Sequence, residues 1–421
     1  MDILLKAVTI IDPLSPFHSQ TKDIFIKDGI ISSISDSHLQ NADQVIDKPG
    51  LFISPGWVDI FSHFSDPGHE YKETLESGAA AAAAGGFTDV FLVPNTTPPV
   101  HNKSGVAYLV QKSKALPVRI YPIGAVTKHI EGKEFAEMYD MQQSGAVAFS
   151  DGLNSIQSSG VLLKALQYVQ AIDKTIIQLP DDKSISPNGL INEGVLSTQL
   201  GLPGKPAIAE DLMISRDIEL VRYTGSKIHF TGISTKGSVE LIRKAKTDKL
   251  NVTCSVTPYH LCFLDEDLAS YDTNLKVNPP LRTPADRQAL MDGIKDGTID
   301  CITSHHLPED VDHKVVEFEY AANGMIGLQT CFAAVCTAIP ELSPDRIVEL
   351  FSSNARKIFE LETCTIDLNK LACLTIFSRE ESWMPENSSN LSKSANSAFF
   401  NKKLNGRSLG IINKGNLFLN T

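Results

Sequence analysis

Four histidines and one aspartate follow apolar segments of this chain, at places where side chains often do chemistry. They are His63, Asp151, His260, His305 and His306. Imidazole and carboxylate groups bind zinc and transfer protons, so these residue types suit a catalytic metal site. Such a site needs about three protein ligands and one open position. Because neighbouring residues on a strand point to opposite faces, only one of His305 and His306 is expected to contribute.

The segments that would position these residues follow one another in a regular order between residues 51 and 361. Short β-rich runs, apolar on both faces, alternate with helical stretches. Eight such runs predict an α/β fold, a (β/α)8 TIM barrel of parallel strands surrounded by helices. The expected strands are 51–60, 87–94, 118–126, 145–150, 175–180, 227–234, 251–258 and 299–304. The expected helices are 73–86, 103–115, 155–172, 207–224, 237–248 and 284–297.

Active-site residues of a TIM barrel lie at the carboxyl ends of its strands. Besides the residues above, these ends carry Phe61, Asn95, Gln178 and Gly232. Phenylalanine and glycine offer no side-chain donor atom to a metal, and zinc prefers thiolate, imidazole and carboxylate ligands to an amide. The strand ends therefore supply few side chains that could bind a metal, and these lie on different strands.

The two ends of the chain have a different texture from the middle. Residues 1–50 and 362–421 contain short β-like runs joined by turns, and Lys-Asp-Gly at 27–29 is a hairpin signal. Chain termini often lie close together in space. We therefore expect these two segments to form one small composite β-sandwich domain, beside a barrel that spans residues 51–361.

The net charge, hydrophobicity and cysteine content of the chain limit its possible binding partners and its cellular compartment. The net charge of −12 argues against non-specific binding to nucleic acid or to an anionic membrane. The apolar runs fall short of the roughly 18–20 residues that span a bilayer, and the N-terminal segment lacks the features of a signal peptide. The seven cysteines are odd in number and form no Cys-x-x-Cys motif. Reduced thiols in a cytoplasmic protein are expected.

Several long segments resemble one family, the dihydroorotases of the cyclic amidohydrolase superfamily, specifically the bacterial class I type. They are SPGWVDIFSHFSDPGHEYKETLESGAAAAAAGGFTDVFLVPNTTPPV, VTCSVTPYHL, TNLKVNPPLRTPADRQALMDGIKDGTIDCI and SSNARKIF. The resemblance covers nearly the whole chain. It implies a zinc-dependent barrel that opens or closes the ring of dihydroorotate in pyrimidine synthesis, commonly as a homodimer.

The family's metal-binding positions are only partly kept. Its strand-one Asp-x-His-x-His motif resembles Asp59-Ile60-Phe61-Ser62-His63, which implies that one histidine ligand is replaced and His63 is retained. The strand-four aspartate of the family is retained as Asp151. The resemblance places the other two histidine ligands at Gln178 and Gly232. The aspartate that carries the proton in the family falls at His305.

The family's substrate contacts are also changed. The arginine that clamps the substrate carboxylate falls at Ser65, and a strand-eight histidine falls at Glu309, a negative charge where the substrate anion would sit. Asn95 and Asn278 remain, as substrate contacts or as side chains that hold loop backbones. For Asp59 we expect a structural role, holding the strand-one loops by hydrogen bonds.

Three interpretations of function remain open. General acid–base groups contribute about 10²–10⁴-fold each, so the loss of three ligands and the proton carrier predicts an inactive chain without cofactor. Such a chain would act as a structural or assembly partner, as some dihydroorotase-like chains do with aspartate transcarbamoylase. The second interpretation is an active zinc-dependent dihydroorotase or related cyclic amidohydrolase, in which His63, Asp151 and His305 form another ligand set. The third is a barrel that binds an unrelated small molecule.

Overall fold

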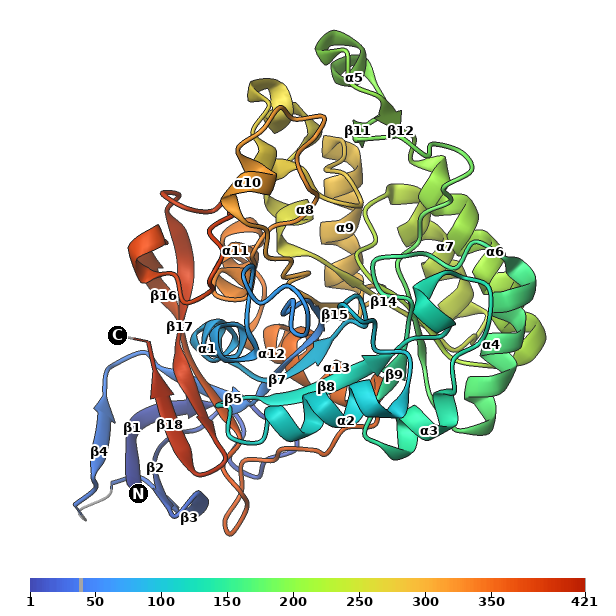
Figure 1. The fold of residues 1–421 in the computed structure, drawn as a ribbon. Coiled ribbons are helices and arrows are strands. Elements are labelled where there is room, and N and C mark those ends of the chain that lie inside the picture. The colour runs from blue at the N-terminus through green and yellow to red at the C-terminus, as the bar shows by residue number, and fades with distance from the viewer. Residues whose placement is uncertain (38–40, 421) are drawn as a thin grey trace.

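A nearly closed barrel of parallel strands forms the centre of the molecule. The computed structural model describes residues 1–37 and 41–420, and within this part the barrel sheet has eight strands (Figure 1). All eight expected strand regions contribute to it. The strands are β6 (Trp57–Ser62), β7 (Phe87–Leu92), β8 (Arg119–Gly124), β9 (Ala148–Phe149), β10 (Ile176–Gln178), β13 (Ile228–Phe230), β14 (Val252–Val256) and β15 (Cys301–Ile302). The prediction of a TIM barrel is confirmed.

The first expected strand, 51–60, is divided between two sheets. β5 (Phe52–Pro55) pairs outside the barrel, and β6 begins the barrel after Gly56. A Cβ atom on Gly56 would lie 2.1 Å from Oγ1 of Thr88, so only glycine permits the close approach at this crossing. The apolar run is continuous in sequence because both halves are buried, each in a different core.

Strands from both ends of the chain form a second sheet beside the barrel. Its order is β18-β17-β16-β5-β1-β2-β3, and β4 pairs with β1. In Figure 1 the blue N-terminal strands and the red C-terminal strands lie side by side. The strands are β1 (Asp2–Ile10), β2 (Thr21–Lys27), β3 (Ile30–Ser35), β4 (Gln44–Asp47), β5, β16 (Leu374–Trp383), β17 (Leu404–Asn413) and β18 (Asn416–Leu419).

Helices cover the outside of the barrel, and all six expected helices are present. They are α1 (Leu75–Gly85), α2 (Lys103–Lys112), α4 (Ser159–Ala171), α6 (Ile208–Thr224), α7 (Lys236–Thr247) and α9 (Pro284–Asp296). Each of α1, α2, α4, α7 and α9 begins after a Ser, Thr or Asn whose side chain accepts a backbone N–H of the first turn. In the described part of the chain, no helix combines the length and the apolar character needed to cross a membrane.

Shorter elements were not expected from sequence, because their hydrophobic periodicity is too brief to recognise. They include α3 (Met138–Gln143), α5 (Val195–Leu200), α8 (Pro258–Cys262), α10 (Val311–Lys314), α11 (Cys331–Ala338), α12 (Pro344–Val348), α13 (Asn354–Ile358) and the two-stranded ribbon of β11 (Ile191–Asn192) with β12 (Gly204–Lys205). In Figure 1 this ribbon and α5 project from the top of the molecule.

A cluster of aromatic rings joins the barrel to the second sheet. Trp57 at the start of β6 is fully buried, and its ring centroid lies 4.8 Å from Phe332, 5.0 Å from Phe351 and 5.2 Å from Phe377. These rings come from α11, from the segment before α13 and from β16. Aromatic pairs add about 0.5–1.5 kcal/mol each beyond the area they bury. The cluster therefore holds the barrel against the strands of the chain ends, and leaves the opposite, carboxyl end of the barrel as the mouth.

Candidate functional site

Asp59 closes the barrel where β6 meets β15, the two strands at the ends of the sheet order. Its buried carboxylate accepts hydrogen bonds from the backbone N–H of Ser304 at 2.6 Å and from the hydroxyl groups of Thr303 and Ser304 at 3.0 Å. The hydroxyl of Ser62 donates a further bond at 2.5 Å. The expected structural role of Asp59 is therefore confirmed, and it ties the two strands on which Phe61, His63 and His305 stand.

Phe61, Gly232 and His305 pack as one unit at the mouth. The centroids of the Phe61 and His305 rings are 4.5 Å apart. Gly232 has φ +65, and a Cβ atom there would lie only 2.5 Å from Cε1 of His305. The imidazole of His305 thus fills the space that any side chain at position 232 would need. The three positions form a packing contact in which only His305 carries a donor or acceptor.

His305 is the last member of a chain of hydrogen bonds inside the barrel. Its Nε2 lies 2.7 Å from Oγ1 of Thr231, which accepts a bond from Ser255 at 3.2 Å. Ser255 Oγ lies 3.0 Å from Nε2 of His229, whose Nδ1 lies 2.9 Å from Oγ1 of Thr253. Burial lowers the pKa of both His229 and His305 to about 3. Both rings are therefore neutral at pH 7 and share protons only through hydrogen bonds.

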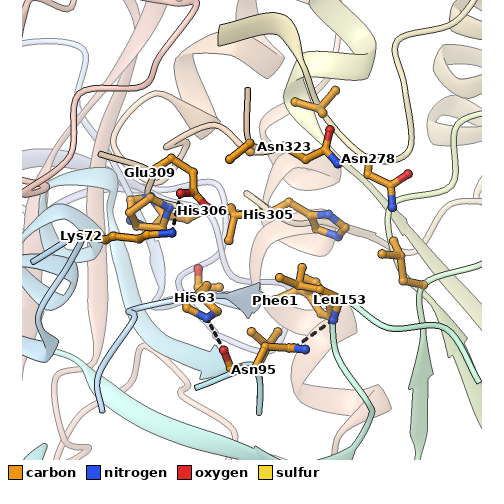
Figure 2. Close-up of a pocket in the computed structure, with 18 of the residues that line it drawn as sticks. Phe61, His63, Lys72, Asn95, Leu153, Asn278, His305, His306, Glu309 and Asn323 are labelled. Carbon is orange, nitrogen blue, oxygen red and sulfur yellow. Dashed lines mark hydrogen bonds and ion pairs between the residues drawn. The ribbon is translucent and has the colours of Figure 1, made fainter. Parts of the chain in front are cut away.

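Both ring nitrogens of His63 already have partners. Nδ1 accepts a bond from the backbone N–H of Ser65 at 3.1 Å, so the proton is on Nε2, which donates to the carbonyl oxygen of Asn95 at 2.8 Å. Burial lowers the pKa of His63 to about 4. Asn95 in turn accepts a bond from the backbone N–H of Leu153 at 2.9 Å (Figure 2). His63 and Asn95 therefore hold the loops after β6, β7 and β9 together.

The carboxylate of Asp151 accepts hydrogen bonds from residues at the end of the neighbouring strand, β8. Its Oδ1 accepts bonds from the backbone N–H groups of Val126 at 3.0 Å and Thr127 at 2.9 Å, and its Oδ2 accepts the hydroxyl of Thr127 at 2.5 Å. The side chain is buried, and burial raises its pKa above the ordinary value. Three donors thus use the lone pairs that would otherwise face the mouth.

Gln178 turns away from the mouth toward α6. Its amide nitrogen lies 3.3 Å from Oδ2 of the buried Asp217, whose Oδ1 accepts a bond from Arg216 at 2.7 Å. Burial raises the pKa of Asp217 to about 6. Position 178 therefore belongs to the contact between the barrel and its helices.

The other two histidines also fix loops. His260 in α8 has Nδ1 2.7 Å from the hydroxyl of Thr257, and its Nε2 lies 3.2 Å from the carbonyl oxygen of Pro279. Burial lowers the pKa of His260 to about 4. His306 lies with Nε2 3.2 Å from the buried carboxylate of Glu73, and its Nδ1 accepts the backbone N–H of Gly327. Neither ring has a nitrogen left for a ligand.

The negative charge of Glu309 is neutralised. Its Oε2 lies 2.6 Å from Nζ of Lys72, and both side chains are largely buried (Figure 2). The sequence predicts a negative charge at this position but not its partner, because Lys72 lies far away in sequence and no local pattern reveals the pair. Ser65 contributes its hydroxyl to the contact with His63 at 3.0 Å.

The residues at the mouth surround a cavity of about 350 Å³. Its walls include Phe61, Leu153 and the Lys72–Glu309 pair, and Figure 2 draws them around the cavity. Asn278 lines it with its Oδ1 bound to Lys205 at 2.8 Å. Asn323, which follows α10, lines it too. The side chain of Asn323 and Nδ1 of His305 are among the groups of this lining that form no hydrogen bond within the described part of the chain.

Comparisons with known proteins agree on the family. Residues 50–238 match the family model described as dihydro-orotase-like. The chain is 37% identical over 422 residues to the dihydroorotase of Syntrophus aciditrophicus, covering 99% of each chain. It is 40% identical to the dihydroorotase of Ruminiclostridium cellulolyticum, covering 95% of this chain and 94% of that one. This chain belongs to the dihydroorotase family. The resemblance noted from the sequence is thereby confirmed.

A solved structure shows the same fold as this dihydroorotase-family chain. The L-hydantoinase of Arthrobacter aurescens superposes with a TM-score of 0.86 over 99% of this chain and 95% of its own, at 23% identity. Agreement of this extent at such low identity is agreement of architecture. This chain therefore shares the fold of that hydantoinase along nearly its whole length.

The zinc that membership of the dihydroorotase family implies does not fit the side chains present. Phe61 and Gly232 have no donor atom, and Gln178 faces α6. The donor atoms of His63 and Asp151 are engaged by Ser65, Asn95 and the backbone after β8. In the described part of the chain, no group of three His, Cys, Asp or Glu side chains is arranged to hold a metal ion. The assignment of His63 and Asp151 as metal residues stays a prediction.

Several residues of this site carried no signal in the sequence. Lys72, Thr231, His229 and Asn323 become important only through contacts across the barrel. Thr231 and His229 lie within an expected strand, but the polar chain that they form depends on the register of three strands. Contacts of this kind follow from the closed barrel and could not be inferred from spacing.

Proposed function

We propose that this chain is a dihydroorotase-family protein that has lost dihydroorotase chemistry and acts through its shape. The observation that supports the proposal is the packing of Phe61 and His305 into the space beside Gly232, where the family resemblance places two metal ligands and the proton carrier. The scaffold is kept while the mouth is filled with neutral, hydrogen-bonded groups. The expected role is that of a structural or assembly partner in pyrimidine synthesis.

Aspartate transcarbamoylase is the partner that we propose. The chain itself is proposed to be a cytoplasmic homodimer, consistent with seven cysteines that are all free in the structure. The test is co-purification of the native transcarbamoylase with and without this chain. A complex that runs larger only when this chain is present supports the partnership. A transcarbamoylase of unchanged size in both samples contradicts it.

The loss of chemistry is tested by zinc content and turnover measured on one sample. The chain is expressed in a host that lacks its own dihydroorotase and is purified without chelator. We expect no stoichiometric zinc and no hydrolysis of dihydroorotate, because each missing acid–base group alone costs about 10²–10⁴-fold. About one zinc per chain together with turnover would establish the alternative, an active zinc-dependent cyclic amidohydrolase.

A second candidate function is binding of a small molecule at the mouth. It is favoured by the cavity of about 350 Å³ and by the unpartnered Asn323 side chain and His305 Nδ1 that face it. Among the described residues that line the cavity, the one lysine is paired with Glu309, so an uncharged ligand suits the site better than an anion. Amide and imidazole groups beside apolar walls match a small cyclic amide.

This candidate is tested by thermal unfolding in the presence of hydantoin, dihydrouracil and dihydroorotate. A ligand at 100 times its Kd stabilises the folded state by about 2.7 kcal/mol. We expect a rise in Tm with an uncharged cyclic amide that is lost in Asn323→Leu and kept in Asn387→Leu, an exposed control away from the cavity. No rise with any of the three compounds would remove this candidate.

A further inference from the structure

Two cysteines lie together at the opposite end of the barrel from the mouth. Nη2 of Arg119, the first residue of β8, is 3.2 Å from Sγ of Cys373 and 3.9 Å from Sγ of Cys364. Both sulfur atoms therefore lie beside the same guanidinium group. Both line a surface cavity of about 680 Å³, so a small molecule from solvent can reach them. Cys364 is partly exposed and Cys373 is buried.

The surroundings of this pair favour one thiolate and one thiol. The neighbouring thiol of Cys364 lowers the pKa of Cys373 to about 7, against burial and the Asp89 carboxylate and with help from Arg356 and Arg119. The nearby Cys373 and burial raise the pKa of Cys364, which stays protonated. Thiolates beside guanidinium groups are the reactive form of cysteine. Burial raises the pKa of every other cysteine: Cys254, Cys262, Cys301, Cys331 and Cys336.

We propose that Cys373 and Cys364 are a peroxide-sensitive thiol pair that closes reversibly to a disulfide. In the first step the thiolate of Cys373 attacks one oxygen of hydrogen peroxide, the O–O bond breaks, and hydroxide leaves and takes a proton to become water. Cys373 is then a sulfenic acid. In the second step Sγ of Cys364 attacks Sγ of Cys373, the S–O bond breaks, and a second water leaves with the thiol proton.

The position of the pair gives the modification a structural consequence. Cys364 lies in the segment between α13 and the second sheet, and Cys373 directly precedes β16. A disulfide would fasten this segment to the start of β16, beside the point where the backbone N–H of Gly56 bonds to the carbonyl oxygen of Cys373 at 2.9 Å. Oxidation would also remove the thiolate from Arg119. The link thus lies where the barrel joins the strands of the chain ends.

Tryptic mapping of the full chain tests the proposal directly. Trypsin cleaves after Lys357, Lys370 and Arg379, which places Cys364 in peptide 358–370 and Cys373 in peptide 371–379. After treatment with hydrogen peroxide and blocking of free thiols, we expect these two peptides to be joined and to separate again on reduction. Recovery of both peptides as blocked free thiols would overturn the proposal.

Variants separate the two steps. In Cys364→Ser the sulfenic acid of Cys373 has no thiol to attack it, so we expect it to be trapped by dimedone and no cross-link to form. Cys262→Ser is the matched control, because Cys262 is also partly exposed but lies away from Arg119; its cross-link should equal that of the wild type. We also expect iodoacetamide to label Cys373 at pH 7 at least about 10-fold faster than Cys262. Equal labelling rates in a folded protein would contradict the proposed thiolate.

Discussion

At the mouth of the barrel, His63, His260 and His305 are buried with neutral partners. At the opposite end, here called the floor, Asp89 is buried against Arg356, which is also buried, and Arg119, which is partly exposed. The ring nitrogens of the three histidines meet hydroxyl groups, carbonyl oxygens and backbone N–H groups. At the floor, Asp89 Oδ2 lies 2.6 Å from Arg356 and Asp89 Oδ1 lies 3.1 Å from Arg119. The two ends of the barrel therefore surround their titratable groups with different partners.

The difference in partners decides which groups keep their charge. Burial lowers the pKa of the three histidines to about 3–4, because the cost of desolvating an imidazolium outweighs the hydrogen bonds to carbonyl oxygens that oppose it in His63 and His260. Burial also acts to lower the pKa of Arg119 and Arg356, but Asp89 raises both above their ordinary values. The three histidines of the mouth are thus neutral, whereas the floor holds a charged network.

This fold can lose charged groups at the mouth without losing its structure, but not at the floor. The residues at the mouth hold loops, and their neutral hydrogen bonds do so without a metal or a charge. The charges at the floor connect β7, β8, α13 and the cysteines before β16, so their loss would leave unpaired charges in a core. A chain selected only for its shape would keep the second set and could exchange the first.

The largest effect is expected at the floor, in Asp89→Asn. This change leaves the buried Arg356 without a carboxylate and leaves Arg119 with only the exposed Glu362. Breaking a buried ion pair on one side costs about 3–5 kcal/mol. The free energy of unfolding in urea measures the loss. Glu362→Gln is the matched control, because Glu362 contacts the same Arg119 but is exposed, and we expect it to change stability by at most about 1 kcal/mol. Equal effects of both variants would show that the floor charges are not structural.

The next largest effect is expected at the mouth, in Gly232→His. The new side chain must enter the space of the His305 ring at a backbone φ of +65. Overpacking costs about 1–3 kcal/mol, and the left-handed backbone adds about 1–2 kcal/mol. We measure the free energy of unfolding for Gly232→His alone and with His305→Ala, which frees the space.

The combined variant separates the two costs. We expect the combined variant to recover the free energy of unfolding that Gly232→His loses through steric overlap. The loss caused by the left-handed backbone should remain. A Gly232→His chain that is as stable as the wild type and binds zinc would contradict the packing interpretation. The mouth would then still be able to assemble a metal site.

The sequence predicts the scaffold better than the contacts at its mouth. The eight strands and six helices follow from the alternation of apolar β-rich runs with helical stretches, which is a local signal. The splitting of 51–60 into two strands was missed, because residues buried in two different cores read as one apolar run. The pairing of Glu309 with Lys72 and the packing of His305 beside Gly232 join residues far apart in sequence, and only the closed barrel brings them together. The residue types at positions 61, 178 and 232 show that metal-binding side chains are missing there. They do not show which side chains occupy the space instead.

The neutral state of His305 predicts a dependence of stability on pH. Its pKa is about 3 in the folded chain and about 6.5 when unfolded, so the unfolded state binds more protons between these values. The stability that His305 contributes is present above about pH 6.5 and falls by about 1.4 kcal/mol per pH unit below it. Between pH 7.5 and pH 5, we therefore expect the free energy of unfolding of His305→Gln to fall by about 2 kcal/mol less than that of the wild type.

Urea unfolding at several pH values provides this measurement. Phe61→Leu is the control, because it disturbs the same ring contact without removing a titrating group. It should lower stability equally at every pH. A pH dependence in His305→Gln that matches the wild type would mean that His305 is charged in the folded state, and the mouth would then resemble the floor.

The smallest effect is expected for Thr231→Val, which removes a hydroxyl group from the polar chain behind His305 at nearly constant shape. Nε2 of His305 and Oγ of Ser255 each lose a partner, and a buried hydrogen bond contributes about 1 kcal/mol. Thr21→Val on the exposed start of β2 is the control, with an expected change within about 0.5 kcal/mol. Because the chain continues through Ser255 to His229, combining Thr231→Val with Ser255→Ala should cost less than the sum of the two single changes. Strict additivity would mean that the hydrogen bonds at the mouth act independently of one another. The mouth would then differ from the charged network of the floor in cooperativity as well as in charge.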